Sequence, residues 1–347
     1  TWCLVGSEMC IRDSHKIKHV PVLISDFKNL FPEIKGIWVD GTFGFGGYSD
    51  YLLKAGAKKL IVLDLDPDVK KYVKRLEKKW PNKINFFNSN FIEIKKIITS
   101  LGIEDVEGVF LDIGVSSMQL DKALRGFSFK QDGPLDMRMS RNGPTASDFI
   151  NKADENLISE VIFKYGEEKR SKIIARHIVQ SRKNFKIDTT YKLSKIIEGV
   201  LGFKHSNKKH PATKSFQAIR IAINNELNNL VFGLYSSYDV LKIGGILAII
   251  TFHSLEDRLV KRFFNQVSRI NNPLSELKKV GGISTPLFEK INKKPIVASQ
   301  KEIQLNPRAR SAKLRVVRKL SNTSFNVDTQ ILGLPQISES IKEFQCV

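Results

Sequence analysis

The sequence predicts an α/β fold, a parallel sheet with helices on both faces and a helical subdomain inserted into it. Short apolar runs alternate with helical patterns from Ile37 onward, as expected for strands that are buried on both faces. A glycine-rich turn follows the first of these runs. A long stretch without a convincing strand then interrupts the alternation before it resumes. These three observations decide the fold class.

The first part of the chain supplies four strands with helices between them. The strands are expected at Ile37–Asp40, Leu60–Leu65, Ile84–Phe87 and Gly108–Ile113, and the helices at Ser49–Ala55, Asp68–Lys79 and Phe91–Leu101. Asp68 directly follows Pro67, which suits the first turn of a helix. Because strands alternate with helices, we expect a parallel sheet.

The interruption runs from 126 to 210 and its pattern is helical. Apolar side chains recur there at helical spacing, at Leu157, Val161, Ile162 and Tyr165 and again at Ile173, Ile174 and Ile178. We therefore expect an inserted helical subdomain at 126–210 that recognises the substrate. It would separate the two parts of a discontinuous main domain, 15–125 and 211–320.

Alternation resumes after the insertion. A helix is expected at Thr213–Leu230, where apolar residues share one face, and a strongly apolar strand at Ile246–Phe252. Pro295–Ala298 and Lys313–Val317 are expected to close the sheet as an antiparallel pair. The segment 321–347 is a tail with weak periodicity.

The charge of the chain indicates a polyanionic partner. Lys and Arg total 56 against 36 Asp and Glu, which gives a net charge of +20. Solubility alone does not need such an excess, so nucleic acid is the favoured partner. The alternative is a compositional bias toward lysine, because many lysines lie in polar runs such as Lys58-Lys59.

Cysteine usage and hydropathy narrow the class of protein further. The cysteines are Cys3, Cys10 and Cys346, so neither a disulfide framework nor a thiolate metal site is expected. No run of about eighteen apolar residues and no signal peptide is found, which predicts a cytoplasmic protein without a membrane partner. Residues 1–14 lack an initial methionine and differ in composition from the rest of the chain, so we expect them to be non-native or disordered. The oligomeric state stays open, with a homodimer as one alternative.

The most informative motif is the turn from Gly41 to Gly47, which has four glycines in seven positions. The next strand ends at Asp64. Glycines let backbone approach a ligand closely, and a carboxylate at the following strand end can bind ribose hydroxyls. The pair predicts a nucleoside cofactor, although glycines that serve only the turn would look similar.

The residues around the turn disfavour phosphates. Gly47 is followed by Tyr48 and Ser49, where a triphosphate loop needs a Lys-Ser/Thr pair. Counted from Gly44, the third glycine of a dinucleotide fingerprint would fall on Ser49. A cofactor with an adenosine and no phosphates, such as S-adenosylmethionine, fits better. Asp40 could then accept a hydrogen bond from its ammonium group.

Asp112 ends the fourth strand, so Asp40, Asp64 and Asp112 would share the carboxyl rim of the sheet, where ligands of such folds bind. Helix capping is the alternative role for each of them. His253 follows the strand that ends at Phe252 and could contact a base, or play a structural part. We expect no metal, because His253 has no second His or Cys at ligand spacing.

Aromatic residues and arginines in the loops suit RNA. Phe127 and Phe129 could stack on bases, although a core role is equally open to them. The cations expected to contact phosphates are Arg138, Arg258, Arg308 and Arg310.

These motifs together resemble the ribosomal RNA small-subunit methyltransferase H family. The resemblance runs in order from about His19 to Lys319 and rests on Gly41-Thr42-Phe43-Gly44 with Gly46-Gly47, Asp112-Ile113-Gly114-Val115-Ser116-Ser117, Arg125-Gly126-Phe127-Ser128-Phe129, the segment 132–139, Tyr165-Gly166-Glu167-Glu168, the segment 210–217, the segment 252–258 and Asn306-Pro307-Arg308-Ala309-Arg310-Ser311.

The resemblance implies a Rossmann-like class I methyltransferase that uses S-adenosylmethionine to methylate N4 of a cytidine in the decoding region of 16S rRNA, with the small ribosomal subunit as the context. The cofactor contacts that it implies are Gly46, Gly47, Tyr48, Asp64, Phe91, Asp112 and Gln119. One position departs from the family, which often has His where this chain has Tyr48. Asp112 and His253 are the candidate catalytic residues.

Three rival functions are open at the level of sequence. A DNA amino-methyltransferase usually has a Pro-Pro-aromatic triplet after the fourth-strand acid, where this chain has Ile113-Gly114-Val115. A non-catalytic RNA-binding protein would explain the charge but not the rim of acids. A nicotinamide oxidoreductase is the weakest alternative, because of the misplaced third glycine.

Overall fold

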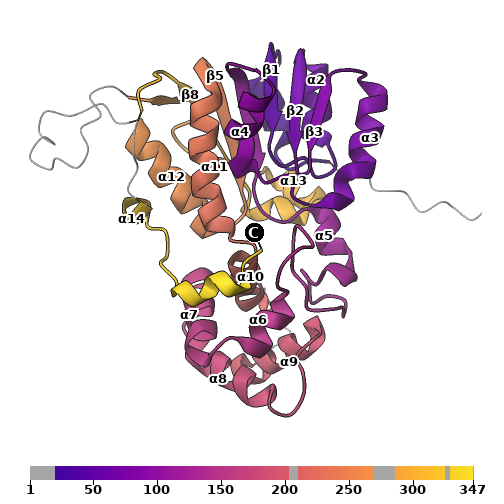
Figure 1. The fold of residues 1–347 in the computed structure, drawn as a ribbon, viewed down its shortest axis with the longest axis vertical. Helices are drawn as coiled ribbons and strands as arrows, with labels where there is room; N and C mark the ends of the chain where they lie inside the picture. Colours follow the sequence, from indigo (N-terminus) through magenta and orange to yellow (C-terminus); the bar gives the residue numbers. More distant parts are fainter. Residues whose placement is uncertain (1–19, 203–209, 269–285, 325–328, 347) are drawn as a thin grey trace, which may run out of the picture.

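A computed structural model describes residues 20–202, 210–268, 286–324 and 329–346 of the chain. The segment 1–14, which the sequence predicts to be non-native or disordered, lies outside these residues. Figure 1 shows a sheet layered with helices in the upper half of the molecule and a helical subdomain below it. Within the described residues, no helix is long and apolar enough to cross a membrane.

The central sheet has the strand order β3-β2-β1-β4-β5-β8-β6, and β7 pairs with β8. Its strands are β1 Ile37–Asp40, β2 Lys59–Leu63, β3 Ile84–Phe87, β4 Val106–Asp112, β5 Leu241–Thr251, β6 Phe288–Lys290, β7 Ile296–Val297 and β8 Lys313–Lys319. The first five strands are parallel, and β8 runs antiparallel to β5. The chain order reverses between β1 and β4, which is where ligands of such sheets bind. The predicted Rossmann-like sheet is confirmed.

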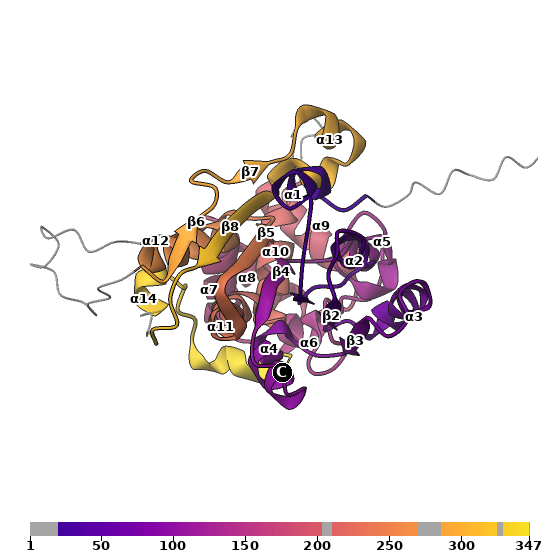
Figure 2. The ribbon, with the colours of Figure 1, turned by 90° about the horizontal axis from the view of Figure 1, so that it is seen from above.

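Both faces of the sheet are covered, which explains its continuous apolar runs. Val39 and Val109 belong to a core with α4 Ile94–Ser100, α11 Glu226–Val240 and α12 Ser254–Val267. The alternate residues of the same strands, such as Trp38 and Phe110, belong to a core with α1 Ile24–Leu30, α2 Gly47–Lys54 and α3 Lys70–Lys79. Figure 2 shows the two helical layers from above.

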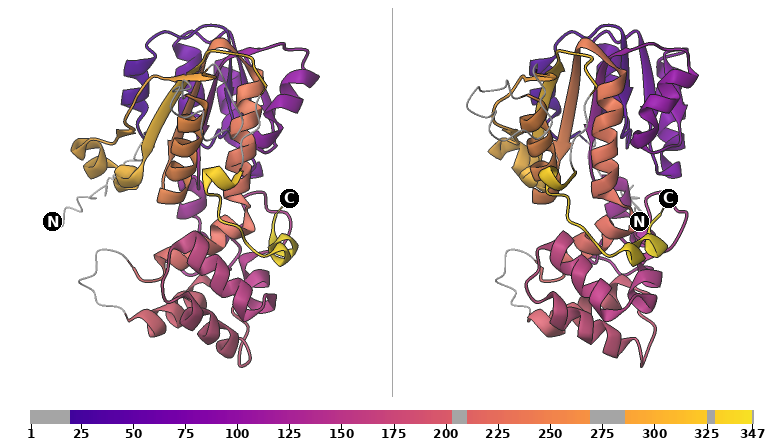
Figure 3. Two further views of the ribbon diagram at one scale, coloured as in Figure 1. Left: turned by 90° about the vertical axis from the view of Figure 1, so that its left-hand side faces the viewer. Right: turned by 60° about the vertical axis from the view of Figure 1, so that its left-hand side comes forward.

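The helical subdomain contains α6 Ala146–Lys152, α7 Glu155–Gly166, α8 Ser171–Ser181 and α9 Thr190–Leu201. The helices α6, α7 and α9 begin at capping side chains, for example Thr145 before α6, whose hydroxyl accepts from Asp148 N at 3.0 Å. α10 Thr213–Ile223 packs against α7 and leads back toward the sheet. Figure 3 shows the subdomain below the carboxyl ends of the strands.

The prediction of one helix over Thr213–Leu230 is wrong. α10 ends at Ile223 and α11 begins at Glu226, because Asn225 has the left-handed conformation with φ 50°. Asn is one of the few residues that adopts this conformation readily. The apolar periodicity continues across the break because both helices face the same core.

The C-terminal segment returns to the helical subdomain, as its yellow trace in Figure 1 shows. It contains α14 Thr329–Leu332 and a short 3₁₀ helix at Glu339–Phe344. The Phe344 ring packs against Phe149 of α6 at 5.4 Å between centroids. Cys346 N donates to Ile223 O at 2.7 Å, so the segment also fixes the end of α10.

Candidate active site at the carboxyl ends of the strands

A pocket of 360 Å³ lies beyond the carboxyl ends of β1, β2 and β4. One side is formed by the glycine turn, by Asp64 and Leu65 after β2, and by Phe91. The lining also includes Ile113–Val115 after β4 and Glu226 at the start of α11. A single cavity of this size could therefore hold two reacting groups side by side.

The glycine turn is tied to the acid at the next strand end. Gly44 N donates to Asp64 Oδ2 at 2.8 Å, and Asp66 N donates to Asp64 Oδ1 at 2.8 Å. Burial raises the pKa of Asp64 to about 7, against the effect of these two hydrogen bonds. Asp64 thus fixes the turn and also lines the pocket.

Close approach of backbone requires glycine at the start of α2. A Cβ on Gly47 would lie 2.2 Å from Cγ of Pro21, and Gly46 has φ 77°. Gly47 lines the pocket, whereas Gly46 supports it as the residue before α2. The N-terminal residues Pro21 and Val22 complete this wall.

Asp40 does not line the pocket. It is fully buried behind the turn, where Oδ2 accepts from Ser49 Oγ at 2.6 Å and Oδ1 from Thr42 N at 3.2 Å. Burial raises its pKa to about 6. Its position supports the backbone of the turn and offers no contact to the ammonium group of a cofactor in the pocket, for which the sequence had suggested it.

Asp112 lines the pocket at the end of β4. Its N–H donates to Thr42 Oγ1 at 2.6 Å, but its buried Oδ1 has no hydrogen-bond partner within the described part of the chain. Burial, followed by the charges of Asp40 and Glu256, raises the pKa of Asp112 to about 8. A buried polar atom needs a hydrogen-bond partner, which a ligand in the pocket or a water molecule can supply.

Tyr48, Phe91 and Gln119 also line the pocket. The Tyr48 ring stacks on Phe110 at 3.9 Å between centroids, and its hydroxyl donates to Val22 O at 2.5 Å. Burial raises the pKa of Tyr48 well above its usual value. Gln119 is held by donating from Nε2 to Asp66 Oδ2 at 2.9 Å.

Most of the side chains predicted to contact RNA lie outside the pocket. Phe127 is buried in the core, and Phe129 packs on His210 and Phe216. Three of the arginines pair with carboxylates of the same chain: Arg138 binds Asp136 through two nitrogens, Arg258 binds Glu167 at 2.9 Å, and Arg308 binds Asp121. Arg308 alone among these residues is in the pocket lining, and Arg310 is exposed.

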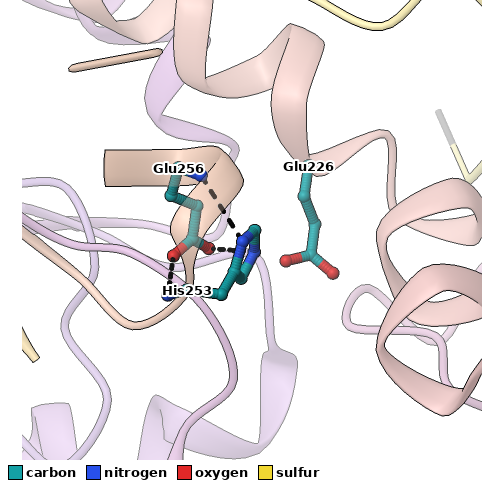
Figure 4. Close-up of side chains that lie close together, drawn as sticks. All are labelled: Glu226, His253 and Glu256. Atoms are coloured by element: carbon teal, nitrogen blue, oxygen red, sulfur yellow. Dashed lines mark hydrogen bonds and ion pairs between the residues drawn. The ribbon is translucent and has the colours of Figure 1, made fainter. Parts of the chain in front are cut away.

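A charged cluster lies beside the pocket, and of its members the sequence had pointed to His253 but not to Glu226. Figure 4 shows Glu226, His253 and Glu256, of which Glu226 lines the pocket. Arg220 donates to both oxygens of Glu226 at 2.8 Å. His253 is nearly buried and caps α12. The Asn224-Asn225 pair, which ends α10 just before Glu226, was the signal available in the sequence.

The comparison with protein families decides what the pocket belongs to. Residues 16–320 match the model of the MraW methylase family. The chain belongs to this family. The match spans both parts of the main domain and the helical subdomain.

Curated relatives agree over almost their full length. The chain is 41% identical over 320 residues to the ribosomal RNA small subunit methyltransferase H of Parvibaculum lavamentivorans, covering 91% of this chain and 93% of that protein. The protein of the same name from Roseobacter denitrificans is 41% identical over 321 residues, covering 92% and 95%. A solved rRNA methylase from Streptococcus thermophilus has 11% identity, a TM-score of 0.40, and coverage of 85% of this chain and 93% of its own.

Family membership confirms the resemblance inferred from the ordered motifs. The chain is a methyltransferase, and its methyl donor is S-adenosylmethionine, as the sequence predicted. The residues present fit this cofactor. The glycine turn offers backbone at close approach, Asp64 offers a carboxylate for ribose hydroxyls, and Asp112, which lines the pocket, has an oxygen without a partner among the described residues.

Proposed function

We propose that this protein methylates N4 of a cytidine in the decoding region of 16S rRNA, within the small ribosomal subunit. The proposal is supported by relatives that are named as methyltransferases of small-subunit ribosomal RNA. The observation that carries it is the 360 Å³ pocket, whose lining includes the glycine turn, Asp112 at the end of β4 and Glu226 at the start of α11. One half would hold the cofactor, and the other would hold the base.

The bound cofactor supplies a methyl group on a sulfonium, which needs little further activation. Asp64, Gly47, Tyr48, Phe91, Asp112 and Gln119 are the residues proposed to hold it. The chain's main task is then to hold the acceptor nitrogen in line with the bond that breaks, at near-attack distance.

The part of the pocket that holds the base has to suit an exocyclic amine. The lone pair of a cytosine N4 is delocalised into the ring, so a group that accepts its N–H bonds favours attack. The base must also unstack from its neighbours in the RNA to enter a pocket that lies beyond the ends of the strands. The net charge of +20 suits the phosphates that accompany it.

The helical subdomain, 126–210, is proposed to contact the RNA around the target base, while 15–125 and 211–320 form the methyltransferase domain. Arg308 would contact a phosphate at the mouth of the pocket, since it lines the cavity and its present partner Asp121 is exposed. Figure 3 shows the subdomain below the carboxyl ends of the strands, and the pocket is lined by residues at that end of the sheet.

The test uses unmethylated small-subunit rRNA, offered both naked and in assembled subunits, with methyl-labelled S-adenosylmethionine. Nucleoside mass spectrometry should find the label as N4-methylcytidine. Label at ring C5 of cytosine or on a ribose oxygen would contradict the proposal. Transfer to DNA in preference to rRNA would favour the rival DNA amino-methyltransferase.

A further inference from the structure

Glu226 is a carboxylate in the lining of the pocket that also contains the glycine turn. It is the first residue of α11, lines the cavity, and has a side chain that is only 6% exposed. Arg220 donates from Nε to one oxygen and from Nη2 to the other, both at 2.8 Å. The carboxylate is thus held in one orientation by a bidentate pair.

This carboxylate has unused capacity to accept hydrogen bonds. An ionised carboxylate has about four lone-pair sites, and the guanidinium takes two of them. Across residues 20–202, 210–268, 286–324 and 329–346, Arg220 is the donor that the structure gives to the Glu226 oxygens. The remaining sites can accept N–H bonds from a ligand in the cavity.

Asp112 is less suited to receive a proton. Its pKa, raised to about 8 by burial and by the charges of Asp40 and Glu256, leaves it mostly protonated at neutral pH. A protonated carboxyl donates a hydrogen bond and has no place for another proton. Glu226, by contrast, is held by the Arg220 guanidinium through both oxygens, and its remaining lone pairs can accept from an N–H donor.

A divalent cation is the other ligand that this cluster could hold. One atom each of Glu226, His253 and Glu256 lie within 4.8 Å of one another (Figure 4), and His253 Nε2 lies 2.9 Å from Glu256 Oε1. However, Arg220 already occupies both oxygens of Glu226, and its positive charge would repel a cation there. The geometry therefore favours a neutral N–H donor over a metal ion.

We propose that Glu226 accepts a hydrogen bond from the exocyclic amine of the target base and takes the proton that this amine loses. This inference rests on the proposed function, because it assumes transfer to an amine. The amine nitrogen forms a bond to the methyl carbon, the sulfur–carbon bond breaks, and its electron pair stays on sulfur, which becomes a neutral thioether. The methylated nitrogen is briefly cationic and gives one proton to Glu226.

Glu226→Ala tests the inference, with three readouts on the full chain. Calorimetry measures S-adenosylmethionine affinity, thermal unfolding measures folding, and single-turnover transfer to small-subunit rRNA measures the reaction. We expect cofactor affinity within about threefold of wild type and a transfer rate lower by about 100-fold or more. Sodium formate should restore part of the rate, because a small carboxylate can occupy the vacated place beside Arg220, whereas sodium chloride at equal ionic strength should not.

Asp257→Ala is the matched control. Asp257 is a buried carboxylate of α12 that binds Arg315 at 2.8 Å and Lys313 at 2.7 Å, and it is absent from the pocket lining. The Asp257→Ala variant should lose stability, as Glu226→Ala does. Its rate of methyl transfer should equal that of the wild type and should not respond to formate. Glu226→Asp, which keeps the charge, should retain more activity than Glu226→Ala.

Four outcomes would overturn the inference: a transfer rate of Glu226→Ala within threefold of wild type, a loss that formate does not relieve, a parallel loss of cofactor affinity, or restoration by Mg²⁺, Mn²⁺ or Zn²⁺ in place of formate. The proposed function fails separately, if the wild-type protein places the label on an atom other than cytidine N4. If the wild-type protein makes N4-methylcytidine and Glu226→Ala makes it equally fast, the proposed function stands and only the role of Glu226 is wrong.

Discussion

Gly44 donates its backbone N–H to the carboxylate of Asp64 at 2.8 Å, although the two residues are 20 positions apart in the chain. The bond joins the glycine turn after β1 to the end of β2. It explains why the two motifs occur together: the acid that lines the pocket also fixes the loop that forms its wall. Loss of the carboxylate would therefore alter both the lining of the pocket and the shape of the glycine turn.

The first prediction concerns this double role of Asp64. Asp64→Ala should weaken S-adenosylmethionine binding by at least about tenfold, because hydrogen bonds to a charged group are worth about 1.5–3 kcal/mol each. Isothermal calorimetry measures this affinity for S-adenosylmethionine. Asp50→Ala is the control, since Asp50 binds Lys54 and Lys79 on α2 and α3 and is absent from the pocket lining. Equal affinity of Asp64→Ala and wild type would remove Asp64 from the site.

The second prediction concerns pH. The pKa of Asp112 rises from 3.8 to about 8 in the folded protein, so the native state binds a proton that the unfolded chain releases between these values. Stability then falls as pH rises from about 4 to about 8, because the unfolded state holds fewer protons. Without cofactor, urea unfolding of wild type should show this decline from pH 5 to pH 8, and Asp112→Asn should reduce the slope.

Asp50→Asn is the control for the pH experiment. Its ion pairs with Lys54 and Lys79 lower the pKa of Asp50 to about 2 against the effect of burial, so its contribution changes only below about pH 4. The slope of stability between pH 5 and pH 8 should therefore match wild type. A slope for Asp112→Asn as steep as that of wild type would show that Asp112 ionises normally.

The sequence predicted the sheet because a strand that is buried on both faces consists of a continuous run of apolar residues, which can be recognised directly. It also predicted that Asp64 and Asp112 would share a rim, since strand ends of a parallel sheet meet there. It could not separate Asp40 from them, because burial behind Ser49 depends on packing of α2. Glu226 escaped notice because the helix break at Asn225 has no signature in the apolar periodicity.

The third prediction concerns Tyr48, which lines the pocket in the first turn of α2. The Tyr48 hydroxyl donates to Val22 O and not into the cavity. Tyr48→Phe should therefore leave cofactor affinity unchanged within about twofold and cost about 1 kcal/mol of stability, the typical value of a buried hydrogen bond. Calorimetry and urea unfolding separate the two effects. A large loss of affinity at unchanged stability would mean that the hydroxyl contacts the cofactor.

The fourth prediction concerns RNA. Arg308 lines the pocket and is 41% exposed, and its partner Asp121 is 62% exposed, so the pair is weak in water and can exchange for a phosphate. Arg308→Ala should raise the KM for rRNA and lower the slope of log affinity against log salt by about one, the value for one phosphate contact. Affinity for S-adenosylmethionine should not change. Arg318→Ala, which breaks a similarly exposed pair with Glu289 on β6, is the control and should keep the wild-type salt slope. If both variants lower the salt slope equally, the effect comes from the change in net charge, and Arg308 does not contact a particular phosphate.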